Sequence, residues 1–255
     1  MKNCWIIGAS SGIGLELAKK YYASGWNVII SARRIAKLQE IKQQISLDKN
    51  LGNQIESFAF DVIDYDNFAN VGQLIFEKFK KIDLVIFAPA IYDQMSLHNF
   101  DHKLAVEILN VNLVSSLHFL DIVGKKMLKQ NFGHIAVIAS VAGYRGLPKS
   151  FAYGASKAGL INLFEGIYPE LLANKIDLSI INPGFVATDL TAKNNFKMPF
   201  LISANKASDY IFQGLEKKDF EIHFPKKFTF FMKFLRHLPN SFYLKFINYV
   251  YKNDK

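Results

Sequence analysis

The sequence predicts an α/β fold in which helices cover both faces of a doubly wound parallel sheet. Apolar runs rich in Val and Ile alternate along the chain with segments of helix length. The runs are continuously apolar, as in strands buried on both faces, and such strands pair in parallel through helical crossovers. With 255 residues, half of them hydrophobic, the chain is long enough to bury a substantial core as one domain.

Each expected element follows from its pattern. The expected strands lie in "CWIIGAS" (4–10), "WNVIISA" (26–32), "IESFAFDV" (55–62), "IDLVIFAP" (82–89), "HIAVIAS" (134–140), "IDLSIINPG" (176–184) and "FEIHF" (220–224). The expected helices are residues 12–24, 33–48, 64–80, 102–130, 151–173 and 203–217. Sheets of this kind bind ligands at the carboxyl ends of their strands, so the polar residues that follow each strand are the candidates for a site.

Charge and cysteine content restrict the function. The formal net charge is +9, but residues 226–255 alone carry seven Lys or Arg against one acid, so most of the excess is in this tail. The remainder has no basic stripe, and we therefore expect no nucleic-acid partner. Cys4 is the only cysteine, so an intrachain disulfide is impossible and a reducing compartment is favoured. We expect no secretory leader and no membrane-spanning run, hence a cytoplasmic protein.

A glycine-rich turn joins the first strand to the first helix. In "GASSGIG" glycines stand at positions 8, 12 and 14. Glycines allow a tight turn and a close backbone approach to a pyrophosphate, and the helix N-terminus adds free N–H groups and a positive dipole end. An ordinary strand-to-helix turn would also use glycine. The position at the start of an alternating chain favours a dinucleotide site.

The second strand ends in "IISARR", where an NAD site usually places an acid for the ribose 2′-hydroxyl. Arg33 and Arg34 stand there instead, and a guanidinium can bind a 2′-phosphate with two charge-assisted hydrogen bonds. The sequence therefore favours NADP, the alternative being arginines that start a solvated helix. Asp61, after the third strand, could accept from an adenine amino group or cap the next helix.

"FAYGASKAGL" places Tyr153 one helical turn before Lys157, so both side chains project from one helix face. A nearby cation favours the phenolate and can bring a tyrosine into use as a general acid or base. An amphipathic helix with a half-buried Tyr and a solvated Lys would give the same pair, so the pair needs supporting residues elsewhere.

With the glycine turn, "YGASK" and a serine thirteen residues before the tyrosine, residues 1 to about 225 resemble the short-chain dehydrogenase/reductase family. The resemblance implies a Rossmann-like sheet, and a catalytic tetrad of Asn112, Ser140, Tyr153 and Lys157. Tyr153 would give or take the proton, and Ser140 would orient the substrate oxygen. Lys157 would bind the nicotinamide ribose and lower the pKa of Tyr153. Asn112, rather than its competitor Asn110, would hold a water that links Lys157 to solvent.

The resemblance also implies the cofactor contacts. "NPGFVATDL" matches the turn that forms the wall beside the nicotinamide, with Val186 and Thr188 against its carboxamide. No metal is needed. The full set of expected cofactor contacts is Gly8, Ser10, Ser11, Gly12, Ile13, Gly14, Arg33, Arg34, Asp61, Val62, Ala88, Tyr153, Lys157, Pro183, Gly184, Val186 and Thr188.

Three features depart from the family pattern. Ile7 replaces a threonine before the first glycine, and residues 87–90 read Phe-Ala-Pro-Ala instead of NNAG. Their joint change suggests that apolar packing replaces one polar brace between adjacent strands. Pro169 lies inside the helix after Lys157 and is expected to kink it, which makes a homo-oligomer through this helix less secure.

The implied function is an NADP-dependent oxidoreductase that moves a hydride between the nicotinamide and a carbonyl or alcohol carbon. Alternatives are a non-catalytic NADP-binding scaffold and a membrane-surface protein. The segment 188–204 is expected to form the substrate rim. It favours an apolar substrate through Phe196, Met198, Pro199, Phe200 and Leu201.

The last thirty residues, 226–255, form a basic aromatic tail with two amphipathic helices broken at Pro239 and Asn240. The first helix is expected to gather its apolar residues on one face, with Lys233, Arg236 and His237 opposite. That apolar face comprises Phe228, Phe231, Met232, Phe234, Leu235 and Leu238. One interpretation folds the tail over the sheet as a lid or subunit contact. The other places it on a membrane surface on the cytoplasmic side.

Overall fold

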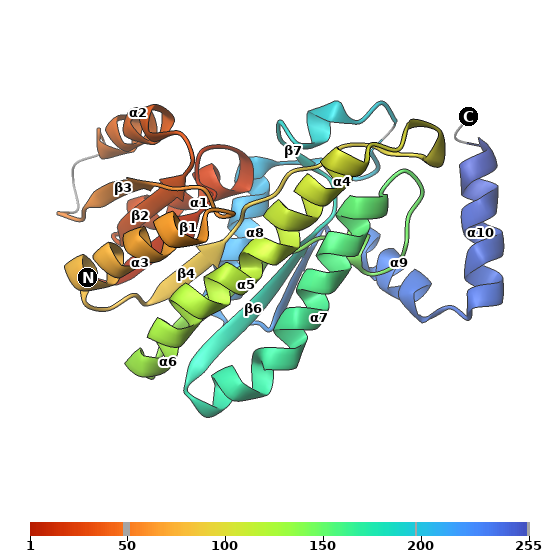
Figure 1. Cartoon of the computed structure of the whole chain (residues 1–255). Helices are drawn as coiled ribbons and strands as arrows, with labels where there is room; N and C mark the ends of the chain where they lie inside the picture. Colours follow the sequence, from red (N-terminus) through yellow and green to blue (C-terminus); the bar gives the residue numbers. More distant parts are fainter. Residues whose placement is uncertain (48–51, 197, 254–255) are drawn as a thin grey trace.

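One parallel sheet lies between two layers of helices, in the computed structural model, which describes residues 1–47, 52–196 and 198–253 (Figure 1). Seven strands pair in the order β3-β2-β1-β4-β5-β6-β9, all parallel. This confirms the doubly wound α/β fold, because the chain winds outward from β1 in both directions. The strands are β1 (Asn3–Ile7), β2 (Asn27–Ala32), β3 (Ile55–Ala59), β4 (Leu84–Phe87), β5 (Gly133–Ile138), β6 (Ile176–Pro183) and β9 (Glu221–Phe224).

The expected helices are also present, within a few residues at each end. Residue 48, the expected end of the second helix, lies outside the described residues. A short parallel pair, β7 (Val186–Ala187) with β8 (Ile202–Ser203), follows the sixth strand. The helices are α1 (Gly12–Ala23), α2 (Ile35–Ser46), α3 (Tyr65–Phe79), α4 (His102–Leu109), α5 (Ser115–Phe119), α6 (Lys125–Gln130), α7 (Phe151–Ala173), α8 (Ala204–Glu216), α9 (Lys226–His237) and α10 (Asn240–Asn253).

The core has two halves, one on each face of the sheet. In β1 every residue is buried, and successive side chains belong to opposite halves: Cys4 and Ile6 to one, Trp5 and Ile7 to the other. This follows from the two-residue period of a strand. Helices α1, α2 and α8 pack on the first half, and α3, α7 and the helix from 102 to 130 pack on the second. The continuous apolar runs are therefore explained by burial on both faces.

Helices α4 to α6 form one helical segment, His102–Gln130, interrupted by two π-helical stretches, Asn110–Val114 and Leu120–Gly124. By length and composition alone this segment could cross a membrane, which corrects the expectation that no segment could. Its apolar character has a structural use, because Phe119, Val123 and other side chains are fully buried in the core.

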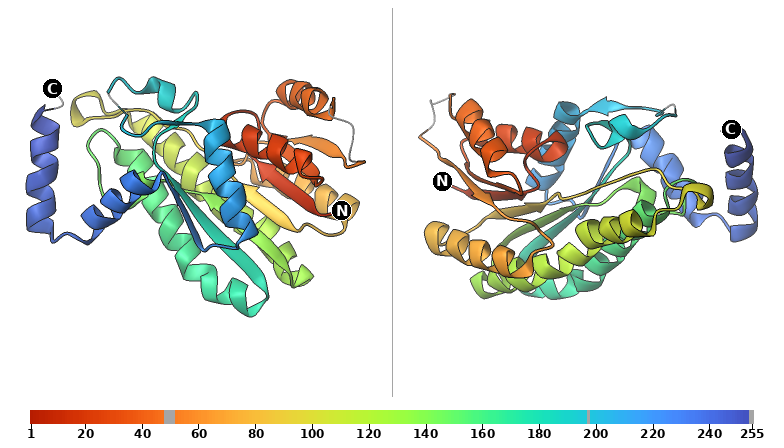
Figure 2. Two further views of the ribbon diagram at one scale, coloured as in Figure 1. Left: turned by 180° about the vertical axis from the view of Figure 1, so that it is seen from behind. Right: turned by 45° about the horizontal axis from the view of Figure 1, so that its top comes forward.

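The tail begins as part of the same core. In α9, Thr229, Met232 and Leu235 are buried. The ribbon of α10 lies at the edge of the molecule in every view (Figures 1 and 2), but it is attached through Tyr243, which is buried and donates its hydroxyl to the Gly146 carbonyl. The expected break between the two helices is confirmed, but the expected apolar face of α9 is partly wrong. Phe231 and Phe234 are exposed, and Lys233 turns inward to Glu221, because that half-buried carboxylate needs a counter-ion.

The helix with Pro169 continues beyond it to Ala173. Because Tyr153 and Lys157 lie in the first two turns of α7, the proline lies about three turns beyond Lys157 and more than four beyond Tyr153.

Candidate active site

A cavity of about 420 Å³ opens at the carboxyl ends of the central strands. Its lining contains every residue that the sequence predicts as a cofactor contact, together with Ser140. Residues from seven separate segments thus converge on one space. The set is Gly8, Ser10, Ser11, Gly12, Ile13, Gly14, Arg33, Arg34, Asp61, Val62, Ala88, Ser140, Tyr153, Lys157, Pro183, Gly184, Val186 and Thr188.

The glycine turn has the backbone geometry that only glycine adopts easily. Gly8 and Gly12 have φ values of 89° and 56°. A Cβ on Gly14 would lie 2.3 Å from the carbonyl oxygen of Gly8, so no side chain fits there. The N-terminus of α1 has no side-chain cap and no acid in its first turn. The turn and the helix end therefore offer N–H groups to an anion.

Beside this turn, an apolar contact takes the place of the polar brace. Ile7 and Phe87 are paired across β1 and β4, and each is 1% exposed. The Ala88 N–H donates to the Ile7 carbonyl at 2.9 Å, which continues the strand pairing past Phe87. The expected replacement of polar by apolar packing is confirmed.

At the end of β2, Arg33 lies beside Asp61, with 3.8 Å between Nη1 and Oδ2. The Arg33 side chain is 62% exposed, so it can turn toward a ligand at the cavity mouth. Asp61 does not cap α3, because Asp64 does so by accepting from the Asn67 N–H. The helix-cap alternative for Asp61 is therefore wrong.

Tyr153 and Lys157 lie in the first and second turns of α7 (Phe151–Ala173), and Tyr153 faces Ser140 just after β5. A hydrogen bond joins Ser140 to the Tyr153 side chain. The Ser140 hydroxyl also accepts from the Ala142 N–H at 3.1 Å, which fixes the turn that follows the strand. Lys157 is 1% exposed, and its ammonium donates to the Ile138 carbonyl at 2.8 Å.

The pKa values of this pair differ from expectation. Burial raises the pKa of Tyr153 to about 12, although the Ser140 hydrogen bond acts to lower it. Burial lowers the pKa of Lys157 to about 7. The expected lowering of the tyrosine pKa by Lys157 is not found. The physical reason is that both groups are desolvated, which disfavours the phenolate and weakens the cation that should stabilise it.

Asn112 lies within the first π-helical stretch and is fully buried. Its amide oxygen accepts from the Ile91 N–H at 2.8 Å, and its amide nitrogen donates to the Ile91 carbonyl and to the Ser156 hydroxyl. Asn110, the competing candidate, is exposed. The Asn112 amide does not reach the cavity lining; it holds the backbone of Ile91, which does.

The turn after β6 completes the wall. Thr188 comes close to the glycine turn, because a Cβ on Gly12 would lie 3.1 Å from its methyl carbon. A Cβ on Gly184 would lie 2.7 Å from the ring of Phe228, so α9 packs directly on this turn. The cofactor loops and the tail therefore support one another.

The expected apolar rim is wrong in its details. The segment 188–204 gives Thr188, Asp189, Leu190, Thr191 and Lys193 to the lining, whereas the five predicted apolar residues lie outside it. Phe196 packs on Phe185 instead, with ring centroids 5.8 Å apart. The five apolar residues therefore give no support to an apolar substrate.

Sequence reasoning missed Tyr92 and Gly143. The ring of Tyr92 lies edge-on to Tyr153, with centroids 5.0 Å apart, and its hydroxyl donates to Asn194 at 2.8 Å. A Cβ on Gly143 would lie 2.7 Å from the Lys157 carbonyl carbon, so the turn after Ser140 rests on the α7 backbone. The glycine that ends "VIASVAG" (137–143) was a visible signal for Gly143, but nothing in the sequence marked Tyr92.

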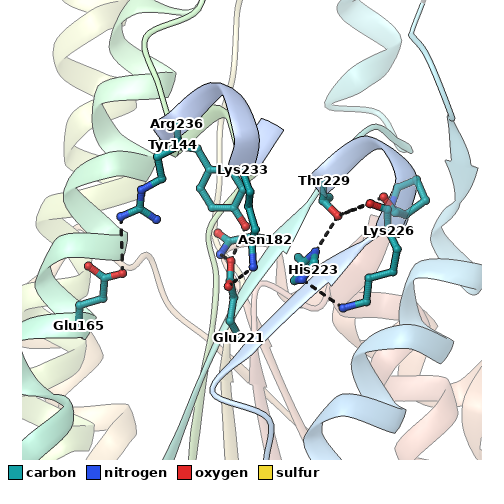
Figure 3. A network of polar contacts seen from close by, with 10 residues as sticks. Tyr144, Glu165, Asn182, Glu221, His223, Lys226, Thr229, Lys233 and Arg236 are labelled. Carbon is teal, nitrogen blue, oxygen red and sulfur yellow. Dashed lines mark hydrogen bonds and ion pairs between the residues drawn. The ribbon is translucent and has the colours of Figure 1, made fainter. Parts of the chain in front are cut away.

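A polar network attaches α9 to the sheet (Figure 3). The Glu221 carboxylate accepts from the Tyr144 hydroxyl, from the Asn182 amide at 3.0 Å and from the Lys233 ammonium at 2.5 Å. Burial alone would raise the pKa of this carboxyl, but its hydrogen bonds, led by that from Lys233, hold the pKa below its usual value. Tyr144 stands four residues after Ser140, so the network also fixes the segment that follows the serine.

Among the described residues, no group of three or more His, Cys, Asp or Glu side chains is placed to hold a metal ion.

Comparisons with known proteins agree with this geometry. The family described as short chain dehydrogenase matches residues 2–198. An uncharacterized oxidoreductase of Myxococcus xanthus (strain DK1622) is 29% identical over 242 residues, which cover 95% of this chain and 94% of the relative.

Solved structures share the fold. An alcohol dehydrogenase from the archaeon Thermococcus sibiricus, complexed with 5-hydroxy-NADP, aligns over 88% of this chain and 96% of its own, with a TM-score of 0.78 and 21% identity. A short chain dehydrogenase/reductase from Burkholderia phymatum, in complex with NAD, aligns over 87% and 88%, with a TM-score of 0.79 and 21% identity. Since the family match spans well over half of the chain, the protein belongs to the short-chain dehydrogenase family of oxidoreductases.

Proposed function

We propose that this protein transfers a hydride between NADP(H) and the carbon of a carbonyl or alcohol, with Tyr153 handling the proton on oxygen. One observation carries the proposal. A single cavity contains the glycine turn at one end and Ser140, Tyr153 and Lys157 at the other. A dinucleotide long enough to reach from one end to the other would present its reactive ring to the hydroxyl pair.

The residues present fit a dinucleotide. Side chains are excluded at Gly14, and the α1 N-terminus faces the same space with its N–H groups unclaimed by any cap. A pyrophosphate requires both features. When bound, the nicotinamide supplies or accepts the hydride, and the protein residues supply orientation and proton transfer.

The preference for NADP over NAD rests on the two arginines after β2. Both are exposed at the cavity mouth, where a carboxylate would repel a phosphate. The partner of Arg33, Asp61, lies 3.8 Å away, which is a loose ion pair that a phosphate can replace. Because the two solved structures named above hold an NADP derivative and NAD, the arginines are the only argument for this choice.

The raised pKa of Tyr153 suits the role of proton donor in the reduction of a carbonyl. At neutral pH a phenol with a pKa of about 12 is almost wholly protonated, so it is ready to give a proton to an alkoxide that forms on the substrate. The hydride adds to the carbonyl carbon, and the Tyr153 proton adds to its oxygen, which gives the alcohol. Ser140, hydrogen-bonded to Tyr153, orients that oxygen.

Lys157 is assigned to the cofactor ribose and to return of the proton to Tyr153. Its pKa of about 7 lets it give up a proton near neutral pH, as a relay must. Asn112 is a positioning residue. It holds the Ile91 backbone and Ser156, and Ser156 precedes Lys157 directly.

The test compares Tyr153→Phe with Tyr92→Phe, a control tyrosine whose ring touches it in the same cavity. Oxidation of NADPH is followed with a panel of aldehydes and ketones. Tyr153→Phe should lose activity by about 10²-fold or more with NADPH affinity kept, whereas Tyr92→Phe should lose far less. Retained turnover in Tyr153→Phe would refute its role. NADPH binding with no turnover of any carbonyl by the wild type would favour the non-catalytic scaffold.

A further inference from the structure

The tail exposes large apolar side chains on the side that faces away from the core. On α9 the exposed phenylalanines are Phe230, Phe231 and Phe234, the last 61% exposed. On α10, Phe242 is 64% exposed. Buried side chains elsewhere in α9 (Thr229, Met232 and Leu235) attach it to the body. Phe230 also touches His223 edge-on, with centroids 5.2 Å apart, and Phe231 touches Phe246 of α10, 6.1 Å away, yet all three rings keep much of their surface exposed. Solvent-facing helix surfaces are normally polar, and an aromatic surface indicates a partner.

Lysines are interspersed with these rings in helical register. Lys227, Phe230, Phe231 and Phe234 follow the spacing i, i+3, i+4, i+7, which places all four on one face of α9. On α10 a similar stripe contains alternating aromatic and basic residues. Its members are Phe242, Lys245, Tyr249 and Lys252, each of them exposed. We call these two stripes together the tail surface.

The lysines of the tail surface differ from the other basic residues of the tail. Lys233 and Arg236 face carboxylates of the body, Glu221 and Glu165. Within the described ranges, neither Lys227 nor Lys245 forms an ion pair with an acidic residue. The cations of the tail that face the body are therefore paired with carboxylates, whereas Lys227 and Lys245 lie beside exposed aromatic rings.

This combination selects the partner. A second copy of the chain, meeting the tail surface through the same surface, would bring like charges together, which is unfavourable. An anionic phospholipid bilayer instead takes rings into its interface and attracts lysines to its headgroups. We propose that the tail surface docks on an anionic phospholipid membrane, with α9 and α10 lying in the interfacial layer. The proposal is independent of the catalytic assignment.

Sedimentation with phospholipid vesicles tests it on the full chain. The wild type should sediment with mixed phosphatidylglycerol and phosphatidylcholine vesicles, and much less with pure phosphatidylcholine. Raising the salt should release part of it, because the screening length falls from about 10 Å at 0.1 M to about 3 Å at 1 M. Phe230→Ala with Phe234→Ala should weaken partitioning by about tenfold for each ring that inserts.

Matched controls separate docking from general stickiness and charge. Leu74→Ala with Leu172→Ala removes comparably exposed apolar side chains from α3 and α7. Lys227→Glu with Lys245→Glu reverses two charges on the tail surface, and Lys126→Glu with Lys129→Glu reverses two exposed charges on α6. Only the tail variants should lose vesicle binding, and circular dichroism with NADPH binding should show each variant folded.

Three outcomes would overturn the proposal. The wild type could stay in solution with anionic vesicles at low salt. The folded tail variants could sediment as the wild type does. The tail variants could change the oligomeric state without any vesicle binding by the wild type, which would identify a second copy as the partner. A failed Tyr153 test would not change the interpretation of these outcomes, because vesicle sedimentation and oligomeric state do not depend on catalysis.

Discussion

Glu221→Gln removes one negative charge from the network that attaches α9 to the sheet. The glutamine keeps the shape and an acceptor oxygen, so Tyr144 and Asn182 still find a partner. The ion pair with Lys233, whose side chain is 28% exposed, is lost. Hydrogen bonds to a charged group contribute about 1.5–3 kcal/mol each, and breaking a fully buried pair costs about 3–5 kcal/mol, which is the upper limit for this half-buried pair. We expect a loss of about 2–4 kcal/mol.

Thermal unfolding measures this loss. For a chain of this size, 1 kcal/mol lowers Tm by about 2–4 °C, so Glu221→Gln should melt about 5–12 °C below the wild type. The control is Glu165→Gln, which breaks the exposed pair with Arg236, 3.9 Å long. That change should cost less than about 1 kcal/mol. Equal melting of the two variants would refute the view that Glu221 anchors α9.

The effect should also depend on pH. The folded-state pKa of Glu221 lies below its usual value, so its contribution is fully present above pH 4.5 and is lost as the pH falls through the folded-state pKa. The gap between wild type and Glu221→Gln should therefore be widest above that value and narrow in acid. A gap that widens in acid would contradict the sign of this linkage.

Two further predictions concern acid and the cofactor. Burial lowers the pKa of His134 and of His223 to about 4, so the free energy of unfolding should be at its full value above pH 6.5 and should fall toward pH 4. The fall should be up to about 1.4 kcal/mol per pH unit for each histidine. Urea unfolding at pH values between 4 and 6.5 measures this fall, and a free energy of unfolding that does not change with pH would contradict the prediction. The wild type should bind NADPH more tightly than NADH, and Arg33→Ala should reduce that preference by about tenfold or more. The control Lys37→Ala, in the helix α2 that follows Arg33, should leave the preference unchanged. Equal affinity of the wild type for both cofactors in titration would show that the arginines only face water.

Residues whose role is local were predictable from sequence. The glycine turn is a property of consecutive backbone positions, and the pairing of Tyr153 with Lys157 follows from one helical turn. Strands buried on both faces left continuous apolar runs that could be read directly. For these reasons the fold and the lining of the cavity were largely accessible before the structure.

Roles that depend on long-range packing were not predictable. Tyr144, Asn182, Glu221 and Lys233 are single polar residues spread over ninety positions of the chain, and only the fold brings them together. The direction of the Tyr153 pKa shift depends on how completely the fold excludes water from the phenol. The four-residue spacing of Tyr153 and Lys157 in the sequence carries no information about that burial. The helical wheel of α9 likewise placed six apolar residues on one face, but the structure buries some of them in the core and exposes others to solvent.

The close approach at Gly143 has a mechanical consequence. Because the turn after Ser140 rests on the backbone of Lys157, with no side chain between them, the spacing of the serine from the tyrosine is set by main chain against main chain. No side-chain substitution can change this distance, because only backbone atoms set it. Substrate specificity can therefore change through side chains that line other parts of the cavity, such as Tyr92 and Leu190, while the distance between the Ser140 and Tyr153 hydroxyls stays fixed.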